Sequence, residues 1–251
     1  MARRMTKSLL LVPVLGLAAC SSLSGPDTAR VEGIRPVNTN TSPNAVIARA
    51  GTQQTEPNSE ENRAMHRDLI RSMLAQGQYY AALAHIEDQK RISGDSLDLR
   101  YLEAEAKRNL NKTAEAIRLY NGLLKTAFDG EAHHGLGLIT FDTDRVGAVQ
   151  HLRMAVQKQP TDAQFRNDLG FALMQSGRYS EALTELATAV ELEPGNIKAR
   201  NNLIVLLIVS GDGARARQVA RDSGMSDEAY VAAQKRAEGF AQSMARSGQK
   251  R

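Results

Sequence analysis

Cysteine, tryptophan and aromatic residues in general are scarce in this 251-residue chain, which has one cysteine, Cys20, no tryptophan and 4% aromatic residues. A single cysteine excludes a disulfide within the chain, so packing alone must stabilise the fold. A core with few aromatic rings depends on aliphatic side chains and alanine, and such a core favours closely packed helices over a sheet of aromatic and β-branched residues. We therefore expect an all-α protein.

The chain also has little net charge once its first residues are set aside. It carries 32 basic and 28 acidic residues, but the basic residues Arg3, Arg4 and Lys7 all precede the first apolar segment. Without these three, 29 basic residues stand against 28 acidic ones. Because phosphate binding needs a clustered basic face, we expect no nucleic acid partner.

Motifs of enzymatic chemistry are missing as well. The sequence has no G-x-S-x-G, no G-K-[ST] phosphate loop, no H-E-x-x-H and no second cysteine. The one group that suggests a metal site is His133, His134, Asp142, Asp144 and His151. Adjacent helical residues point about 100° apart, so neighbouring histidines rarely bind one ion. We expect no catalytic residue, no metal and no cofactor.

The first segment, "LLLVPVLGLAAC", follows a basic start and has an apolar core of about ten residues, too short for a membrane-spanning helix. We interpret residues 1–19 as a signal peptide. The tetrapeptide "LAAC" resembles the lipobox of bacterial lipoproteins, which implies cleavage between Ala19 and Cys20 and lipidation of Cys20. The same resemblance, with Ser21 and Ser22 after the cysteine, implies lipid anchoring at the periplasmic face of the outer membrane. The alternative is a plain secretory signal in which Cys20 is incidental.

Residues 20–60 are rich in Ser, Thr, Asn and Gly and contain four of the seven prolines, with no helical periodicity. Such a composition is typical of a disordered linker. We expect it to tether the rest of the chain to the lipid.

A repeat with a period of 33 or 34 residues occupies 61–225. A small or apolar residue recurs at Ile70, Ala104, Gly137, Gly170 and Ile204. The clearest unit, "DAQFRNDLGFALMQSGRYSEALTELATAVELEPGN", resembles the tetratricopeptide repeat (TPR), a pair of antiparallel helices. The resemblance implies a superhelical solenoid of about five helix pairs, at about 63–96, 97–129, 130–162, 163–196 and 197–224. Residues 226–251 then form a C-terminal capping helix and a basic tail.

Small residues within each unit mark the places where its two helices approach. These are Ala82, Ala116, Gly137, Ala148, Gly170, Ala182 and Ala216. Gly77, Gly177 and Gly211 suit a left-handed residue that ends a first helix, and Pro160 and Pro194 stop a second helix.

In TPR proteins one face of each first helix lines a concave groove that holds a partner segment. By residue-to-residue correspondence that face consists here of Arg67, Arg71, Tyr101, Glu105, His134, Leu138, Phe141, Asn167, Phe171, Met174, Asn201, Val205 and Ile208. Asn167 and Asn201 either bind the backbone of a peptide or solvate the surface. Leu138, Phe171 and Val205 are either an apolar binding stripe or ordinary packing between helices.

A narrower resemblance is carried by the lipobox, the polar linker and the segments "LRYLEAEAKRNL", "AHHGLGLI" and "RNDLGFAL" followed by "ELATAVELEPGN". Over residues 60 to 225 the chain is similar to the TadD-type lipoproteins of the tight-adherence (Flp) pilus system. This resemblance implies a non-enzymatic adaptor for assembly or secretion of Flp pili, with the secretin among its protein partners. Two alternatives are a lipoprotein scaffold that recruits cell-wall enzymes and a periplasmic hydrolase with a site at His134, Asp142 and His151.

Overall fold

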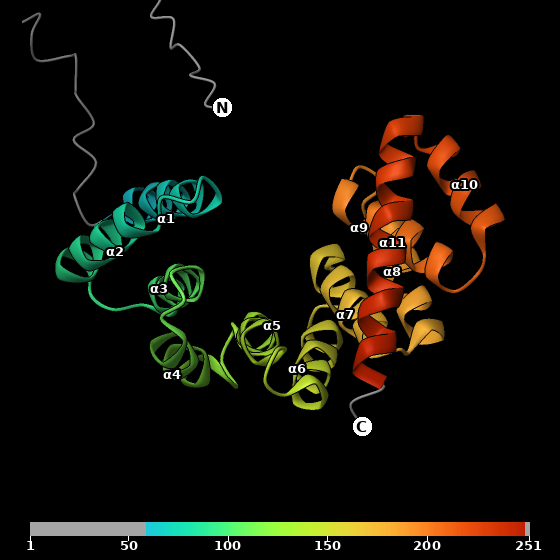
Figure 1. Ribbon diagram of the computed structural model, residues 1–251. Helices are drawn as coiled ribbons and strands as arrows, with labels where there is room; N and C mark the ends of the chain where they lie inside the picture. Colours follow the sequence, from blue (N-terminus) through green and yellow to red (C-terminus); the bar gives the residue numbers. More distant parts are fainter. Residues whose placement is uncertain (1–58, 249–251) are drawn as a thin grey trace, which may run out of the picture. The chain divides into compact units, whose positions relative to one another are not determined.

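The computed structural model of the protein describes residues 59–248, which form eleven helices (Figure 1). Cys20, the signal peptide and nearly all of the predicted linker lie outside the described residues. The helices are α1 (Glu60–Ala75), α2 (Tyr79–Ser93), α3 (Leu97–Asn109), α4 (Thr113–Leu123), α5 (Asp129–Thr140), α6 (Arg145–Lys158), α7 (Ala163–Gln175), α8 (Tyr179–Leu192), α9 (Ile197–Val209), α10 (Gly213–Asp222) and α11 (Asp227–Gly248).

From α1 to α10, helices that follow each other in sequence pack against each other, so each pair packs on the next pair. The first helices of successive pairs also touch, as α1 does with α3 and α7 with α9. The predicted fold class, an all-α array of helix pairs packed like a TPR superhelix, is therefore confirmed. No helix among the described residues is long and apolar enough to cross a membrane.

In four of the five pairs the first helix starts at a polar cap; the cap residue of α5 is Phe128, whose side chain forms no such bond. The side chains of Ser59, Ser96, Asp162 and Asn196 each accept a hydrogen bond from the backbone N–H three residues further on. This satisfies one of the N–H groups that a helix start leaves without a partner inside the helix.

The turn between the two helices of a pair depends on a left-handed residue. Gly77, Gly177 and Gly211 have φ angles of 74°, 72° and 86°, and Asn111 takes the same role in the second pair with φ 58°. In each of these turns the N–H of the next residue bonds to the carbonyl five residues back, as in Arg178 N to Leu173 O at 2.9 Å. The third pair is one residue shorter, and its turn has no positive φ between residues 141 and 144.

Close contact between paired helices depends on small residues. A Cβ at Gly137 would lie 2.7 Å from Leu152 Cγ, and one at Gly170 would lie 2.6 Å from Leu186 Cγ. The corresponding alanines of the second helices have no exposed surface; they are Ala82, Ala116, Ala148, Ala182 and Ala216. Larger side chains at these places would separate the helices of a pair.

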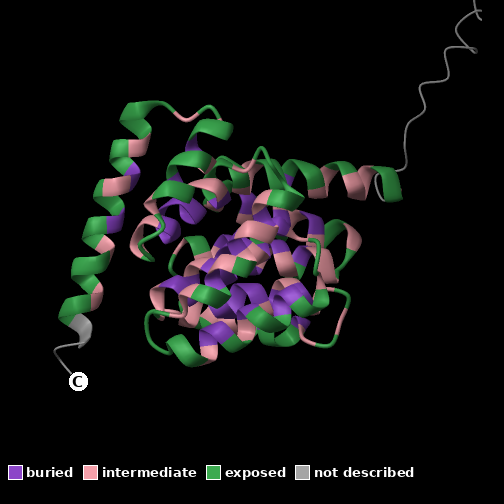
Figure 2. Ribbon diagram, turned by 90° about the vertical axis from the view of Figure 1, so that its right-hand side faces the viewer, coloured by how far each residue is buried: buried purple, intermediate pink, exposed green. Residues whose placement is uncertain are grey.

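The core is a row of buried side chains between helix pairs, seen as purple ribbon in Figure 2. The C-terminal helix α11 packs on α9 and buries Ala233 and Ala237 against it, while most of its other described residues are exposed. Helix α11 thus covers α9, the first helix of the fifth pair.

Candidate protein-binding groove

The predicted groove residues lie on, or at the end of, the first helices α1, α3, α5, α7 and α9, but they differ in burial. Arg71 is exposed. The partly buried members are Arg67, Tyr101, Glu105, Leu138, Phe141, Phe171, Asn201 and Ile208. The buried members are His134, Asn167, Met174 and Val205. The buried ones contact neighbouring helices of the array, so only the others have side-chain surface open to solvent.

At the N-terminal end the groove positions form ion pairs between α1 and α3. Arg67 lies 2.9 Å from Glu60 and 3.9 Å from Asp98, and Arg71 Nη2 lies 3.8 Å from the same Asp98 oxygen. These groups are partly or fully exposed, so each pair adds little stability. This end of the groove is polar and internally balanced.

Further along the groove, Glu105 contacts a buried tyrosine. Tyr120 donates its hydroxyl hydrogen to one oxygen of Glu105, and Arg108 donates to the other at 2.7 Å. Burial, reinforced by the Glu105 charge, raises the pKa of Tyr120 far above its usual range, so the phenol stays protonated. Gly135 makes room for this ring, because a Cβ there would lie 2.2 Å from Tyr120 Cζ.

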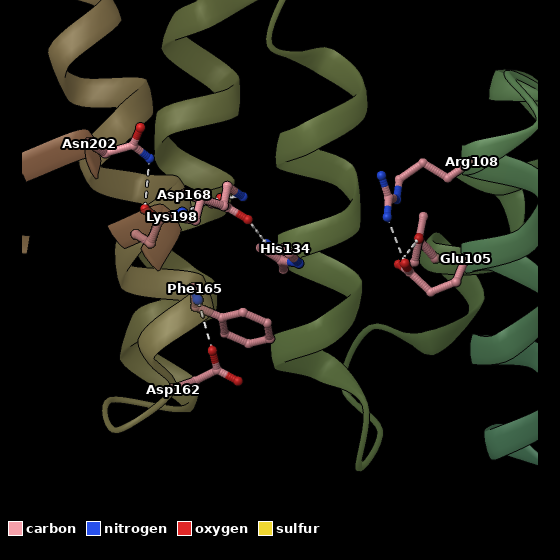
Figure 3. A network of polar contacts seen from close by, with 10 residues as sticks. Glu105, Arg108, His134, Asp162, Phe165, Asp168, Lys198 and Asn202 are labelled. Atoms are coloured by element: carbon pink, nitrogen blue, oxygen red, sulfur yellow. Dashed lines mark hydrogen bonds and ion pairs between the residues drawn. The ribbon is translucent and has the colours of Figure 1, made fainter. Parts of the chain in front are cut away.

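Asp168 on α7 is the centre of a polar network that joins three repeats (Figure 3). One of its carboxylate oxygens lies 2.9 Å from His134 Nε2 on α5, and the other accepts from Lys198 Nζ on α9 at 2.7 Å. Burial opposes the charge of Asp168, but the bonds from His134 and Lys198 outweigh it and lower the pKa of this carboxyl. The His134 ring also stacks on Phe165, with 4.4 Å between ring centres.

A chain of amides extends this network to α11. Asn167 Nδ2 donates to Asp168 Oδ1 at 2.8 Å, and Asn167 Oδ1 accepts from Asn202 Nδ2 at 2.8 Å. Asn202 Oδ1 in turn accepts from Arg236 Nη2 at 3.2 Å. The side-chain amide of Asn167 is therefore hydrogen-bonded within the protein. Asn201, the equivalent residue of the next repeat, has a buried side-chain oxygen without a hydrogen bond.

Sequence reasoning missed Asp168, Lys198, Asn202 and Arg236. A signal exists for two of them, Asp168 and Asn202, because the groove position of one repeat bonds to the following position of the next repeat. His134 and Asp168 are 34 residues apart in sequence, and Asn167 and Asn202 are 35 apart. Polar residues at this offset, on helices that are otherwise apolar, point to bonds between repeats.

A cavity of about 850 Å³ opens beside this network. We call it the α7–α9 cavity; it is lined by Arg108, Leu138, Gln164, Asp168, Phe171, Ile197, Lys198, Asn201, Asn202 and Arg236. Leu138, Phe171 and Asn201 are the predicted groove residues that the structure brings together here. Its size suits a few residues of a bound polypeptide.

The histidines and acids weighed as a metal or hydrolytic site do not form one cluster. His134 bonds to Asp168, while His133 Nδ1 lies 2.9 Å from His151 Nδ1 at the α5–α6 interface. Asp142 is exposed. Over residues 59–248, no group of three or more His, Cys, Asp or Glu side chains is arranged to hold a metal ion.

Comparison with known proteins agrees with this architecture. The tetratricopeptide repeat family model matches residues 143–192 and 175–237. The TPR repeat-containing protein PA4299 of Pseudomonas aeruginosa is 34% identical over 176 residues, which cover 70% of this chain and 70% of that protein.

Two solved structures share the fold at lower identity. The Pseudomonas aeruginosa pilF structure aligns with a TM-score of 0.57 and 17% identity, over 73% of this chain and 88% of that chain. Residues 41 to the end of MamA from Desulfovibrio magneticus RS-1 align with a TM-score of 0.50 and 20% identity, over 64% and 92% of the two chains. At these identities the likeness concerns the fold alone. From the repeat geometry and the identity to PA4299, the chain belongs to the family of tetratricopeptide repeat proteins, which act as scaffolds for protein–protein interaction.

Proposed function

We propose that this TPR scaffold is a lipoprotein anchored through Cys20 at the periplasmic face of the outer membrane, where it serves the assembly or secretion of Flp pili. Its direct partners are pilus components such as the secretin. The proposal rests on one observation, the order of a lipobox-like "LAAC", a polar linker and a TPR array whose repeat sequence resembles TadD-type lipoproteins.

The geometry of the array supports an adaptor more than an enzyme. The hydrolase alternative needs His134, Asp142 and His151 in one pocket, and these three side chains lie in separate surroundings. The α7–α9 cavity instead combines apolar, amide and charged side chains, as a protein-binding surface does.

The lipid anchor is tested by the substitution Cys20→Ala. We expect the variant protein to leave the membrane fraction, because it lacks the thiol that accepts the lipid, while the control Ser22→Ala stays bound. Membrane fractionation with immunoblotting measures this. If Cys20→Ala stays fully in the membrane fraction, the lipoprotein assignment is wrong.

The pilus role is tested by photo-crosslinking in cells that make Flp pili. A photoreactive residue replaces Phe171, which lines the cavity, and a control replaces Thr184, an exposed residue of α8. We expect the secretin or another pilus component to crosslink at position 171 and not at 184, and we expect deletion of the gene to abolish surface pili. Crosslinks to cell-wall enzymes with normal piliation would favour the alternative scaffold and refute the pilus role.

A further inference from the structure

The α7–α9 cavity has more positive than negative charge in its walls. Three cations, Arg108, Lys198 and Arg236, line it together with one carboxylate, that of Asp168. Lys198 is already paired with Asp168 at 2.7 Å. The two other cations are the arginines.

The two arginines differ in how their charges are balanced. Arg108 lies 2.7 Å from Glu105, and this pair is partly buried. Arg236 is exposed and donates to a neutral group, Asn202 Oδ1. Among the described residues no ion pair joins Arg236 to a carboxylate. A guanidinium has five N–H donors in a planar fork that matches a carboxylate, so Arg236 presents most of its binding capacity to the cavity.

The remaining walls suit a polypeptide. Ile197 is 62% exposed, and Leu138 and Phe171 are only partly buried, so the cavity offers apolar surface beside its charge. Asn201, whose side chain is partly exposed, adds a polar group to the same wall.

We propose that the α7–α9 cavity binds an extended acidic segment of a partner protein, in which an Asp or Glu side chain pairs with Arg236 and a neighbouring apolar side chain lies on Ile197 and Phe171. Successive side chains of an extended chain point to opposite sides, so one residue faces α11 while the next faces the apolar wall. This inference rests on the proposed adaptor function and adds to it the chemistry of the partner.

The test uses the full chain in detergent and three fluorescein-labelled octapeptides. The first alternates Asp and Leu with both ends blocked, the second alternates Lys and Leu with both ends blocked, and the third alternates Asn and Leu with a free C-terminal carboxylate. Fluorescence anisotropy measures their affinities at low salt. We expect the Asp peptide to bind at least about tenfold more tightly than the other two, since it alone offers side-chain carboxylates to the cavity.

Variants on α11 locate the contact. Arg236→Gln should weaken binding of the Asp peptide about tenfold, whereas Arg236→Lys keeps the charge and should lose less. The matched control is Lys235→Gln, which removes the same charge from the adjacent exposed position and should leave the affinity unchanged. Circular dichroism checks that α11 stays folded. Ile197→Ser, which changes an exposed side chain of α9, gives a second variant that should weaken binding without touching α11.

Several outcomes would overturn the inference. Equal binding of the Lys peptide, tighter binding of the peptide with the free terminus, or equal losses in Arg236→Gln and Lys235→Gln each contradict it. If one of these results is found while a pilus component crosslinks at position 171, the adaptor function is supported and only the proposal of an acidic partner segment is refuted. Absence of both crosslinks and peptide binding would refute the adaptor function as well.

Discussion

Substitution of Gly170 by alanine tests whether close contact of α7 with α8 holds the fourth helix pair together. A Cβ at position 170 would lie 2.6 Å from Leu186 Cγ and 3.2 Å from the backbone N of Leu186. Such overpacking costs about 1–3 kcal/mol, because a side-chain branch point and a backbone atom cannot turn aside. Alanine gains about 1 kcal/mol over glycine in helix propensity. We therefore expect Gly170→Ala to lower the free energy of unfolding by about 1 kcal/mol, the difference between the two effects.

The assay is urea denaturation followed by circular dichroism, with Gly239→Ala as the control. Gly239 lies inside the exposed part of α11, and a Cβ there meets nothing within 4 Å. The control should gain about 1 kcal/mol, since only helix propensity changes. A gain of similar size in Gly170→Ala would refute the reasoning.

A double substitution sharpens this test. Leu186→Ala removes a fully buried side chain and should cost about 2–5 kcal/mol in the wild-type protein. In the Gly170→Ala background it should cost less, because it also relieves the clash. Purely additive losses would show that the two residues do not compete for the same space.

Two further predictions concern polar contacts. Asp168→Ala should lower the free energy of unfolding by about 2 kcal/mol in the same assay, because it leaves His134 and Asn167 without an acceptor. Lys198→Ala removes a mostly exposed charge and should lower the free energy of unfolding by less than about 1 kcal/mol. Equal losses in the two variants would contradict the central place of the Asp168 carboxylate in the network. His133 and His151 have pKa values that burial lowers, with the His133 charge adding to the effect at His151. The folded state thus binds protons at these two histidines less readily than the unfolded chain does. The stability that the neutral histidines contribute is therefore complete above pH about 6.5 and is lost as the pH falls below that value. The urea midpoint should drop between pH 7.5 and 5, less so in His151→Gln, and an unchanged pH dependence in that variant would exclude the pair as its cause.

The fold class could be predicted from the sequence because its signals are local and repeated. Gly177 ends α7 in a left-handed conformation, and α8 ends two residues before Pro194. A period of 34 residues multiplies such signals, so the helix pairs follow from self-comparison alone.

The site was less predictable, because burial of a groove position depends on the neighbouring repeat. His134 and Asn167 occupy face positions in the repeat frame, yet both are buried by bonds to residues of the following repeat. The place of α11 could not be predicted either. Ala233 and Ala237 indicate a helix with a small-residue seam, but such a seam does not specify α9 as the surface on which it docks.

The bonds between repeats bear on how the array comes apart. In a stacked repeat protein the stability is a sum of the intrinsic stability of each unit and of the interfaces between neighbours. The hydrogen bonds between His134 and Asp168, between Asn202 and Asn167, and between Arg236 and Asn202 all add to the interface part of that sum. We therefore expect the last three repeats and α11 to open together rather than to fray one by one from the C-terminal end.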